Sequence, residues 1–205
     1  MPAFNIAPAT MQPVVRQSRD TAQRELVPMR WGLVGYQSQG PDPQRSTFNA
    51  RSESLESSGL WRGPLHRHRC IVPADGFFEW QKPTREAWRF SLTSGKPLGF
   101  AGLWDAWKNP ADGTWLQSFA IITVPANTLL SGIHDRMPAI LQPQEFDRWL
   151  DRAEVERAPT DLLRPYETTQ MVKHRAHSKV GNVRNQGSRD AKQRLVPTPR
   201  SSIGA

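Results

Sequence analysis

A carboxylate and an imidazole, Glu79 and His134, are the side chains of this sequence best suited to proton transfer. Glu79 belongs to the run DGFFEW (75–80), in which Asp75-Gly76 between apolar residues indicates a turn and Gly76 is free to take a positive φ. Phe77 to Trp80 is then extended, with Phe77 and Glu79 on one face. Partial burial beside aromatic rings would raise the pKa of the Glu79 carboxyl and suit it to general acid or base catalysis. A solvated strand glutamate is the alternative, and this segment alone favours it.

His134 lies in the glycine-led loop GIHDRMP (132–138), which places an imidazole, a carboxylate and a cation within one turn. Imidazole is the natural proton carrier near neutral pH. Glu79 and His134 together would therefore form an acid/base pair. A surface or core histidine is the alternative for His134 taken alone.

Two further pairs could position a ligand. Asn49 and Arg51 are two residues apart, so in an extended segment they share a face and can hold a phosphate or a sugar oxygen. The alternative is that Asn49 caps a helix over 52–60. Trp31 and Gly32 combine an aromatic ring with a residue that lets a ligand approach the backbone, although a core tryptophan beside a bulge fits equally well.

Composition narrows the class of partner. The chain has 205 residues, a net charge of +8 and eight tryptophans, which favours a polyanion, with nucleic acid first and an anionic membrane surface second. Cys70 is the only cysteine, so no intrachain disulfide can form and a reducing, cytoplasmic compartment fits. Neither a signal peptide nor a membrane span is expected, and no metal-ligand spacing, GxSxG motif or P-loop is present.

The pattern of elements predicts one α+β domain of short antiparallel strands. Eighteen prolines and 14 glycines favour many turns over long helices. We expect the domain to cover 1–187 and a basic, flexible tail to cover 188–205, with Cys70 as a small buried hydrophobe. A short helix is expected over 143–150, and strands are expected over 11–16, 26–34, 77–80, 88–92, 97–107, 118–124, 139–141 and 169–174.

Seven segments in order resemble the SRAP (SOS response-associated peptidase) family over nearly the full chain. They are FNIAP (4–8), MRWGLV (29–34), FNARSE (48–53), CIVPADGFFEW (70–80), AIITVPAN (120–127), IHDRMPAIL (133–141) and VGNVRNQG (180–187). The resemblance implies a compact, barrel-like, mostly antiparallel β fold with short helices and a positively charged DNA groove. It also implies a protein, expected to be a monomer without cofactor or metal, that binds single-stranded DNA and attaches covalently to abasic sites.

The family's site residues can be carried over motif by motif. Asn49 would hold the opened sugar and the reacting amino terminus, and Arg51 would contact phosphate. Glu79 and His134 would be the proton-transfer groups. The resemblance further assigns site-lining or DNA-contacting positions to Trp31, Thr123 and Arg136.

One departure from the family pattern concerns the nucleophile. The family uses a cysteine directly after the initiator methionine, whose amine and thiol capture the aldehyde as a thiazolidine, but position 2 here is Pro2 and the family's leading segment is missing. Either the beginning is lost or this member lacks the nucleophile, and we favour the first. The functional hypotheses are a crosslinking protein with lyase and methionine-removing peptidase activity, and a silent single-stranded DNA binder. A general peptidase is disfavoured because no Ser/His/Asp set is apparent.

Overall fold

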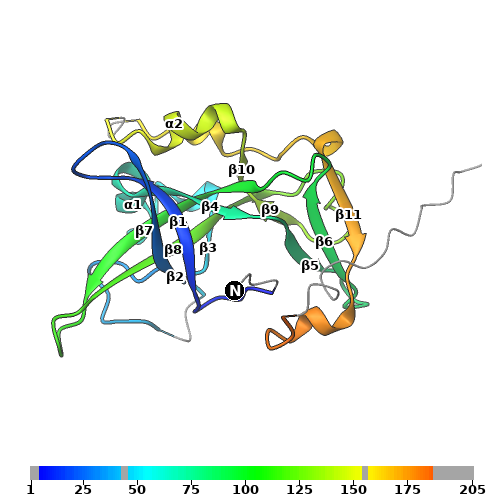
Figure 1. Cartoon of the computed structure of the whole chain (residues 1–205), viewed down its shortest axis with the longest axis horizontal. Helices are drawn as coiled ribbons and strands as arrows, with labels where there is room; N and C mark the ends of the chain where they lie inside the picture. Colours follow the sequence, from blue (N-terminus) through cyan, green and yellow to red (C-terminus); the bar gives the residue numbers. More distant parts are fainter. Residues whose placement is uncertain (1–4, 43–45, 154–156, 187–205) are drawn as a thin grey trace, which may run out of the picture.

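A closed five-stranded β-barrel forms the centre of the computed structural model, which describes residues 5–42, 46–153 and 157–186 (Figure 1). The strands run in the order β7–β4–β1–β2–β8, and pairing of β7 with β8 closes the barrel. All neighbours are antiparallel except β2 and β8, which are parallel. The five strands are β1 (Met11–Gln17), β2 (Arg24–Trp31), β4 (Arg69–Ala74), β7 (Leu98–Lys108) and β8 (Trp115–Pro125).

Strand β8 continues beyond the barrel and acquires new neighbours. Its second half pairs in parallel with β3 (Asn49–Arg51) and antiparallel with β9 (Arg136–Pro138). Strand β10 (Ile140–Leu141) pairs with the first residues of β7. The extension of β8 thus brings β3 and β9 together at one end of the barrel.

A second sheet, in the order β11–β6–β5, stands beside this end of the barrel (Figure 1). Its strands are β5 (Phe77–Trp80), β6 (Ala87–Leu92) and β11 (Met171–Arg175). Gly76 joins β4 to β5, and a Cβ there would lie 2.6 Å from the Phe90 carbonyl oxygen. Glycine is therefore required at position 76 by close approach of the backbone, and not by a positive φ.

The helices are short, as the proline and glycine content predicts. Helix α1 (Arg62–Arg67) packs on the barrel, and α2 (Phe146–Leu150) buries Trp149 completely against it. The described 3₁₀ turns are η1 (Ser52–Ser54), η2 (Pro143–Glu145), η3 (Thr160–Leu162), η4 (Thr168–Gln170) and η5 (Ser178–Gly181). None of the helices in the described ranges combines the length and hydropathy that crossing a membrane requires.

Arg69 fixes the ends of both helices from inside the protein. Its guanidinium donates to the carbonyl oxygens of Leu65, at 2.8 Å, and Trp149, at 2.7 Å, and also to that of Asp151. Carbonyls at helix C-termini have no partner within the helix, so a buried guanidinium satisfies several of them at once. The basic run that precedes Cys70 in the sequence is thus partly structural.

The predicted α+β architecture is confirmed, and the predicted strands and the 143–150 helix appear with shifts of one to a few residues at their ends. The alternative of a helix over 52–60 is wrong, because only Ser52–Ser54 forms a 3₁₀ turn and Asn49 lies in β3. Cys70 is completely buried, as expected. The predicted tail over 188–205 lies outside the described residues.

Candidate active site

Asn49 and Arg51 occupy one exposed face at the end of the barrel. Strand β3 places both outward and buries Ala50 between them, so the amide and the guanidinium share a face as expected. Arg51 lies directly beside Thr123 of β8, whose hydroxyl donates to the Ala50 carbonyl at 3.5 Å. No carboxylate in the described part of the chain pairs with Arg51, which leaves its guanidinium available to an anion.

Arg136, on the other side of β8, is held by protein groups. Its two terminal nitrogens form a bidentate pair with Glu53, with N–O distances of 2.5 and 2.9 Å, and one also donates to the Thr123 carbonyl. The guanidinium lowers the pKa of the Glu53 carboxyl to about 2. The proposed DNA contact of Arg136 remains a prediction, and in this structure its charge is already paired with Glu53, a residue that the sequence analysis did not assign to the site.

The His134 ring is oriented by the turn that precedes β9. Its Nδ1 lies 3.0 Å from the Arg136 amide nitrogen and 3.1 Å from the Arg136 carbonyl oxygen. It accepts from the amide in the neutral tautomer protonated on Nε2, and it donates to the carbonyl when the ring carries a proton on Nδ1. The Asp135 carboxylate lies 3.4 Å from Nδ1 and can stabilise a protonated ring. Nε2 has no partner among the residues described, and the side chain is 32% exposed. His134 can therefore donate a proton from Nε2.

Glu79 meets His134 from the second sheet. Burial raises the pKa of the Glu79 carboxyl, the positive charge of His134 lowers it, and the carboxylate of Asp135 raises it again. His134 and Asp135 are thus both close enough to shift the pKa of the Glu79 carboxyl. The strand register places Glu79 opposite Trp88, on the face that also carries Phe77, as predicted from the alternation in β5. The predicted rise of the Glu79 pKa by desolvation is confirmed.

The loop that carries His134 is braced by buried contacts. The Asn127 amide donates to the Tyr166 carbonyl at 2.8 Å, and its side-chain oxygen accepts from the amides of Leu129 and Leu130. Lys173 of β11 donates to the Leu129 carbonyl at 3.2 Å. Asn127 and Lys173 were not recognised as site residues, although AIITVPAN was among the motifs and Lys173 opens the basic end of the sequence.

Two buried donors at this site have no hydrogen-bond partner. They are Trp88 Nε1 and Arg136 Nε, the only such side-chain nitrogen or oxygen atoms in the described portion of the protein. Trp88 lies opposite Glu79, and Arg136 lies two residues after His134. Buried polar groups are nearly always paired, so each of these two nitrogens points to a water or ligand that completes its hydrogen bonding.

Trp31 and Gly32 lie at the edge of the same barrel end. The Trp31 indole donates to the Phe48 carbonyl at 2.9 Å and stacks on Phe119 with a centroid distance of 6.3 Å, so much of the ring belongs to the core. Gly32 has a φ of +116°, and the Arg30 guanidinium lies 2.9 Å from the position of a Cβ there. The Arg30 guanidinium thus fills the space beside Gly32 in which a ligand was expected.

The two ends of the described chain are locked together near the second sheet. The buried Asn5 amide donates to the carbonyls of Val180 and Asn182, at 3.0 and 3.1 Å. Gln186 exchanges two hydrogen bonds with the Asn5 backbone, at 3.1 and 2.7 Å. Val180 in turn packs with Ala87 and Phe78, the residue next to Glu79. The FNIAP and VGNVRNQG motifs therefore meet at Asn5, beside the sheet that carries Glu79.

The single cysteine is not placed for nucleophilic chemistry. Complete burial raises the pKa of the Cys70 thiol far above its usual range, and its sulfur would lie 2.9 Å from a Cβ at Gly102. Such a thiol is not a nucleophile in the folded protein. Across the described ranges, no three His, Cys, Asp or Glu side chains are grouped as metal ligands.

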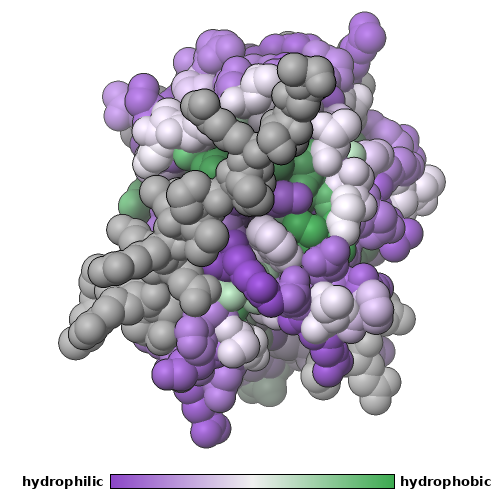
Figure 2. Space-filling model, turned by 90° about the vertical axis from the view of Figure 1, so that its right-hand side faces the viewer, coloured by the Kyte–Doolittle hydropathy of each residue, from purple (hydrophilic) through white to green (hydrophobic). Residues whose placement is uncertain are grey.

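The face that carries the second sheet is shown in Figure 2. Hydrophobic residues are visible near the middle of this face, and hydrophilic residues lie around them.

A stability measurement tests the desolvation of Glu79. A raised pKa in the folded state means that the contribution of Glu79 to stability is complete below the pKa of the unfolded carboxyl and is lost as pH rises through the folded value. We therefore expect Glu79→Gln to raise the melting temperature at pH 7, with the gain disappearing below about pH 4. Glu56→Gln, at an exposed site, is the matched control and should give no gain. A lower melting temperature for Glu79→Gln at pH 7 would contradict this account.

Comparison with curated proteins identifies relatives along most of the chain. The abasic site processing protein HMCES of Gallus gallus is 35% identical over 232 aligned residues, which cover 96% of this chain and 66% of the relative. The abasic site processing protein YoqW of Bacillus subtilis is 34% identical over 188 residues, which cover 90% of this chain and 83% of the relative. The chain thus spans just under two thirds of the chicken protein and most of the bacterial one.

Solved structures agree with this relationship. A crystal structure of a protein from Bacteroides thetaiotaomicron superposes with a TM-score of 0.75 and 26% identity, covering 83% of this chain and 75% of the other. A crystal structure from Bordetella bronchiseptica gives a TM-score of 0.69 and 28% identity over 83% and 85% of the two chains. A family model described as SOS response associated peptidase (SRAP) matches residues 1–183. With its barrel, its motifs and these relatives in agreement, the chain belongs to the SRAP family.

Proposed function

We propose that this protein processes abasic sites in single-stranded DNA, and that a form with a cysteine after its initiator methionine captures them covalently. The observation that carries the proposal is that Glu79, a desolvated carboxylate, lies within electrostatic range of the His134 imidazole, whose Nε2 has no partner among the residues described. Relatives named as abasic site processing proteins support the substrate class.

We assign separate proton transfers to the two groups. His134 Nε2–H donates to the ring oxygen of the abasic deoxyribose while the C1′ hydroxyl releases its proton to water, which opens the sugar to its C1′ aldehyde. The amino terminus then attacks C1′, and Glu79 passes one proton from the amine to the resulting oxyanion, which becomes a hydroxyl. Glu79 takes the second amine proton and delivers it to that hydroxyl, so water leaves and an imine forms. A neighbouring thiol adds to the imine carbon, and its proton goes to the imine nitrogen. A raised pKa suits Glu79 to both steps, because the carboxyl holds a proton more readily than an exposed glutamate and can still release it.

Asn49 and Arg51 would position the strand for these steps. Both side chains are exposed on one face of β3, and the Arg51 guanidinium is free of carboxylates in the part of the chain described. Guanidinium groups bind phosphates by paired charge-assisted hydrogen bonds, whereas the amide can bond to sugar hydroxyls. Arg136 could bind DNA directly only if a phosphate replaced Glu53 as the partner of its guanidinium. We therefore assign Arg136 first to the orientation of His134 and β9.

A second candidate function is a single-stranded DNA binder without covalent chemistry. One observation favours it: the sole cysteine, Cys70, is completely buried, and burial raises the pKa of its thiol. Pro2 lies outside the described residues. The binder would keep the exposed face of β3 and lose the capture step.

A denaturing gel separates the two functions. The chain, and a form carrying the cysteine after methionine, are incubated with single-stranded DNA that contains one abasic site, then denatured. We expect a slower, stable band from the cysteine-bearing form, and none with DNA whose abasic position is a tetrahydrofuran, which has no aldehyde. Binding to both DNAs without a band from either form would establish the silent binder and reject covalent capture.

A further inference from the structure

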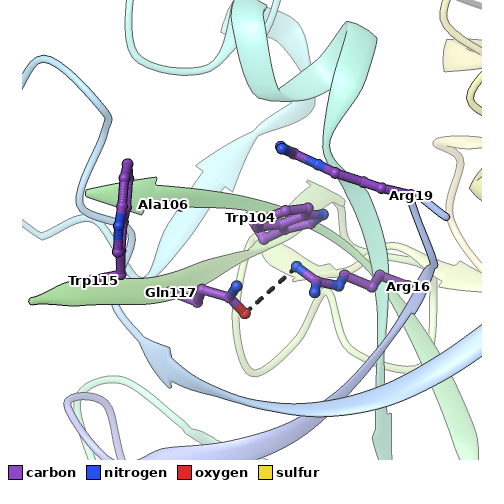
Figure 3. A pocket seen from close by; sticks show the side chains of 6 residues that line it. All are labelled: Arg16, Arg19, Trp104, Ala106, Trp115 and Gln117. Atoms are coloured by element: carbon purple, nitrogen blue, oxygen red, sulfur yellow. Dashed lines mark hydrogen bonds between the residues drawn. The ribbon is translucent and has the colours of Figure 1, made fainter. Parts of the chain in front are cut away.

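The mouth of the barrel at the other end holds a second hollow, of about 240 Å³, which the chemistry above does not use. In Figure 3, Trp115 stands on one side of it, Trp104 and Arg19 stand across from it, and Arg16 and Gln117 lie below. None of the described residues that line it is acidic. The lining residues are Arg16, Arg19, Trp104, Ala106, Trp115 and Gln117.

Strand direction places this hollow far from Glu79 and His134. Strand β8 starts at Trp115, in the hollow, and reaches Thr123, at the candidate active site, after running the length of the barrel. At about 3.3 Å per residue, the six steps from Gln117 to Thr123 span roughly 20 Å. The hollow is therefore a separate location on the molecule, at a barrel mouth, where ligand sites are common.

The floor of the hollow is a fixed stack of rings and charges. The Arg16 guanidinium lies 4.4 Å from the centroid of Trp104, and the His68 ring also stacks on Trp104 at 4.4 Å. Arg16 is held in place by Glu25 at 2.7 Å and contacts the Gln117 side-chain oxygen at 3.4 Å. These contacts orient a guanidinium and an amide toward the hollow before any ligand arrives.

Trp115 and Arg19, which form the walls of the hollow, are exposed to solvent. Trp115 is 60% exposed, and the Lys108 ammonium lies 5.9 Å from its ring centroid. The Arg19 guanidinium lies 3.1 Å from His68 Nε2 and 5.8 Å from the Trp104 ring centroid, and it forms no ion pair with a carboxylate in the ranges described. An exposed indole near cations that lack a carboxylate partner can stack on a base while the cations bind the phosphate.

We propose that the barrel mouth is a second subsite for single-stranded nucleic acid, which takes one intact nucleotide with its base on Trp115 and its phosphate on Arg19. The volume is below the roughly 300 Å³ at which sites for whole small molecules begin, so it fits one flat group. The Gln117 amide can bond to a base edge. An acidic peptide would use the cations but leave the face of Trp115 uncovered. The proposal rests on single-stranded DNA as the partner, but not on capture of abasic sites.

Photocrosslinking tests the location directly. The full chain is irradiated with undamaged single-stranded DNA of about 20 nucleotides that carries 5-iododeoxyuridine, and the crosslinked peptides are identified by mass spectrometry. We expect a crosslink to Trp115. Crosslinks confined to the barrel end that carries Asn49 and Arg51 would overturn the proposal.

Affinity for the same undamaged DNA supplies the second measurement, by fluorescence anisotropy. Trp115→Ala should weaken binding about 5- to 150-fold, the range for loss of one stacked base, and Trp115→Phe should restore part of it. Arg19→Glu should weaken binding and reduce its salt dependence, whereas Arg62→Glu, a matched reversal on exposed α1, should do less. Equal affinity for Trp115→Ala and the unaltered protein would overturn the proposal.

The two proposals fail in different ways. Loss of covalent capture on the gel, with the Trp115 effects intact, rejects the abasic-site function and leaves the subsite. Normal capture with no Trp115 effect rejects the subsite alone. A mononucleotide added as competitor distinguishes a strand from a free nucleotide: displacement of the DNA at equal nucleotide concentration would overturn the strand as the ligand, and displacement by an acidic peptide alone would overturn nucleic acid altogether.

Discussion

Glu79→Gln in the cysteine-bearing form is expected to slow covalent capture of abasic DNA by about 10²- to 10⁴-fold, the usual contribution of a positioned acid or base. Glutamine keeps the size of the side chain and the hydrogen-bonding oxygen, but it cannot accept and return a proton. Because the carboxylate lies on a buried face of β5 and makes no hydrogen bond to the residues described, its removal should leave the neighbouring structure in place.

The affinity for DNA provides the control for this prediction. We expect Glu79→Gln to bind undamaged single-stranded DNA within about twofold of the unaltered protein, because Glu79 carries no positive charge to lose. The rate is followed by quenching samples on a denaturing gel, and affinity is measured by anisotropy. Glu56→Gln should change neither quantity. Parallel losses of rate and affinity would show that Glu79 is structural and not a proton-transfer group.

Local alternation predicted much of the site. The two-residue spacing of Asn49 and Arg51 was sufficient to place them on one face, because Ala50 is small and apolar and turns inward. The same rule placed Glu79 with Phe77. Both predictions depend only on the period of a β-strand, which any short extended segment obeys.

Long-range pairing could not be predicted from local signals. Strand β8 was recognisable as a buried strand, but nothing in it indicates that β2 and β3 pair with it in parallel or that β9 replaces β7 along its second half. The barrel was expected only from the family resemblance. Parallel pairing requires partners distant in sequence, so its register depends on packing across the whole domain.

The roles of the basic residues could not be predicted from local signals either. Arg69 looked like part of a cationic run, yet it is buried and donates to carbonyls of residues about 80 positions away. Arg136 looked free and is paired with Glu53, whereas Arg16 and Arg19 gained significance only because Trp104 and Trp115 lie beside them. Net charge indicates the type of partner, but only the fold decides which cations remain available.

Two substitutions in the 132–138 loop should move the pH dependence of capture in opposite directions. The positive charge of His134 lowers the pKa of Glu79, and the negative charge of Asp135 raises it. The acidic limb of the rate profile, where Glu79 becomes protonated and can no longer accept a proton, should therefore shift to higher pH in His134→Gln. It should shift to lower pH in Asp135→Asn, whose side chain is 85% exposed and whose replacement disturbs little packing.

The rates at the optimum pH separate the roles of these neighbours. His134→Gln removes the proton donor to the sugar oxygen and should slow capture about 100-fold, whereas Asp135→Asn should retain the rate within a few-fold. Single-turnover rates from pH 4 to 9 on one abasic oligonucleotide provide both measurements. Shifts in the same direction, or none, would mean that the Glu79 carboxyl does not sense the two charges, and the acidic limb would then belong to another group. Opposite shifts would show that the imidazole and the carboxylate face one site, because only groups within range of each other's charge can couple in this way.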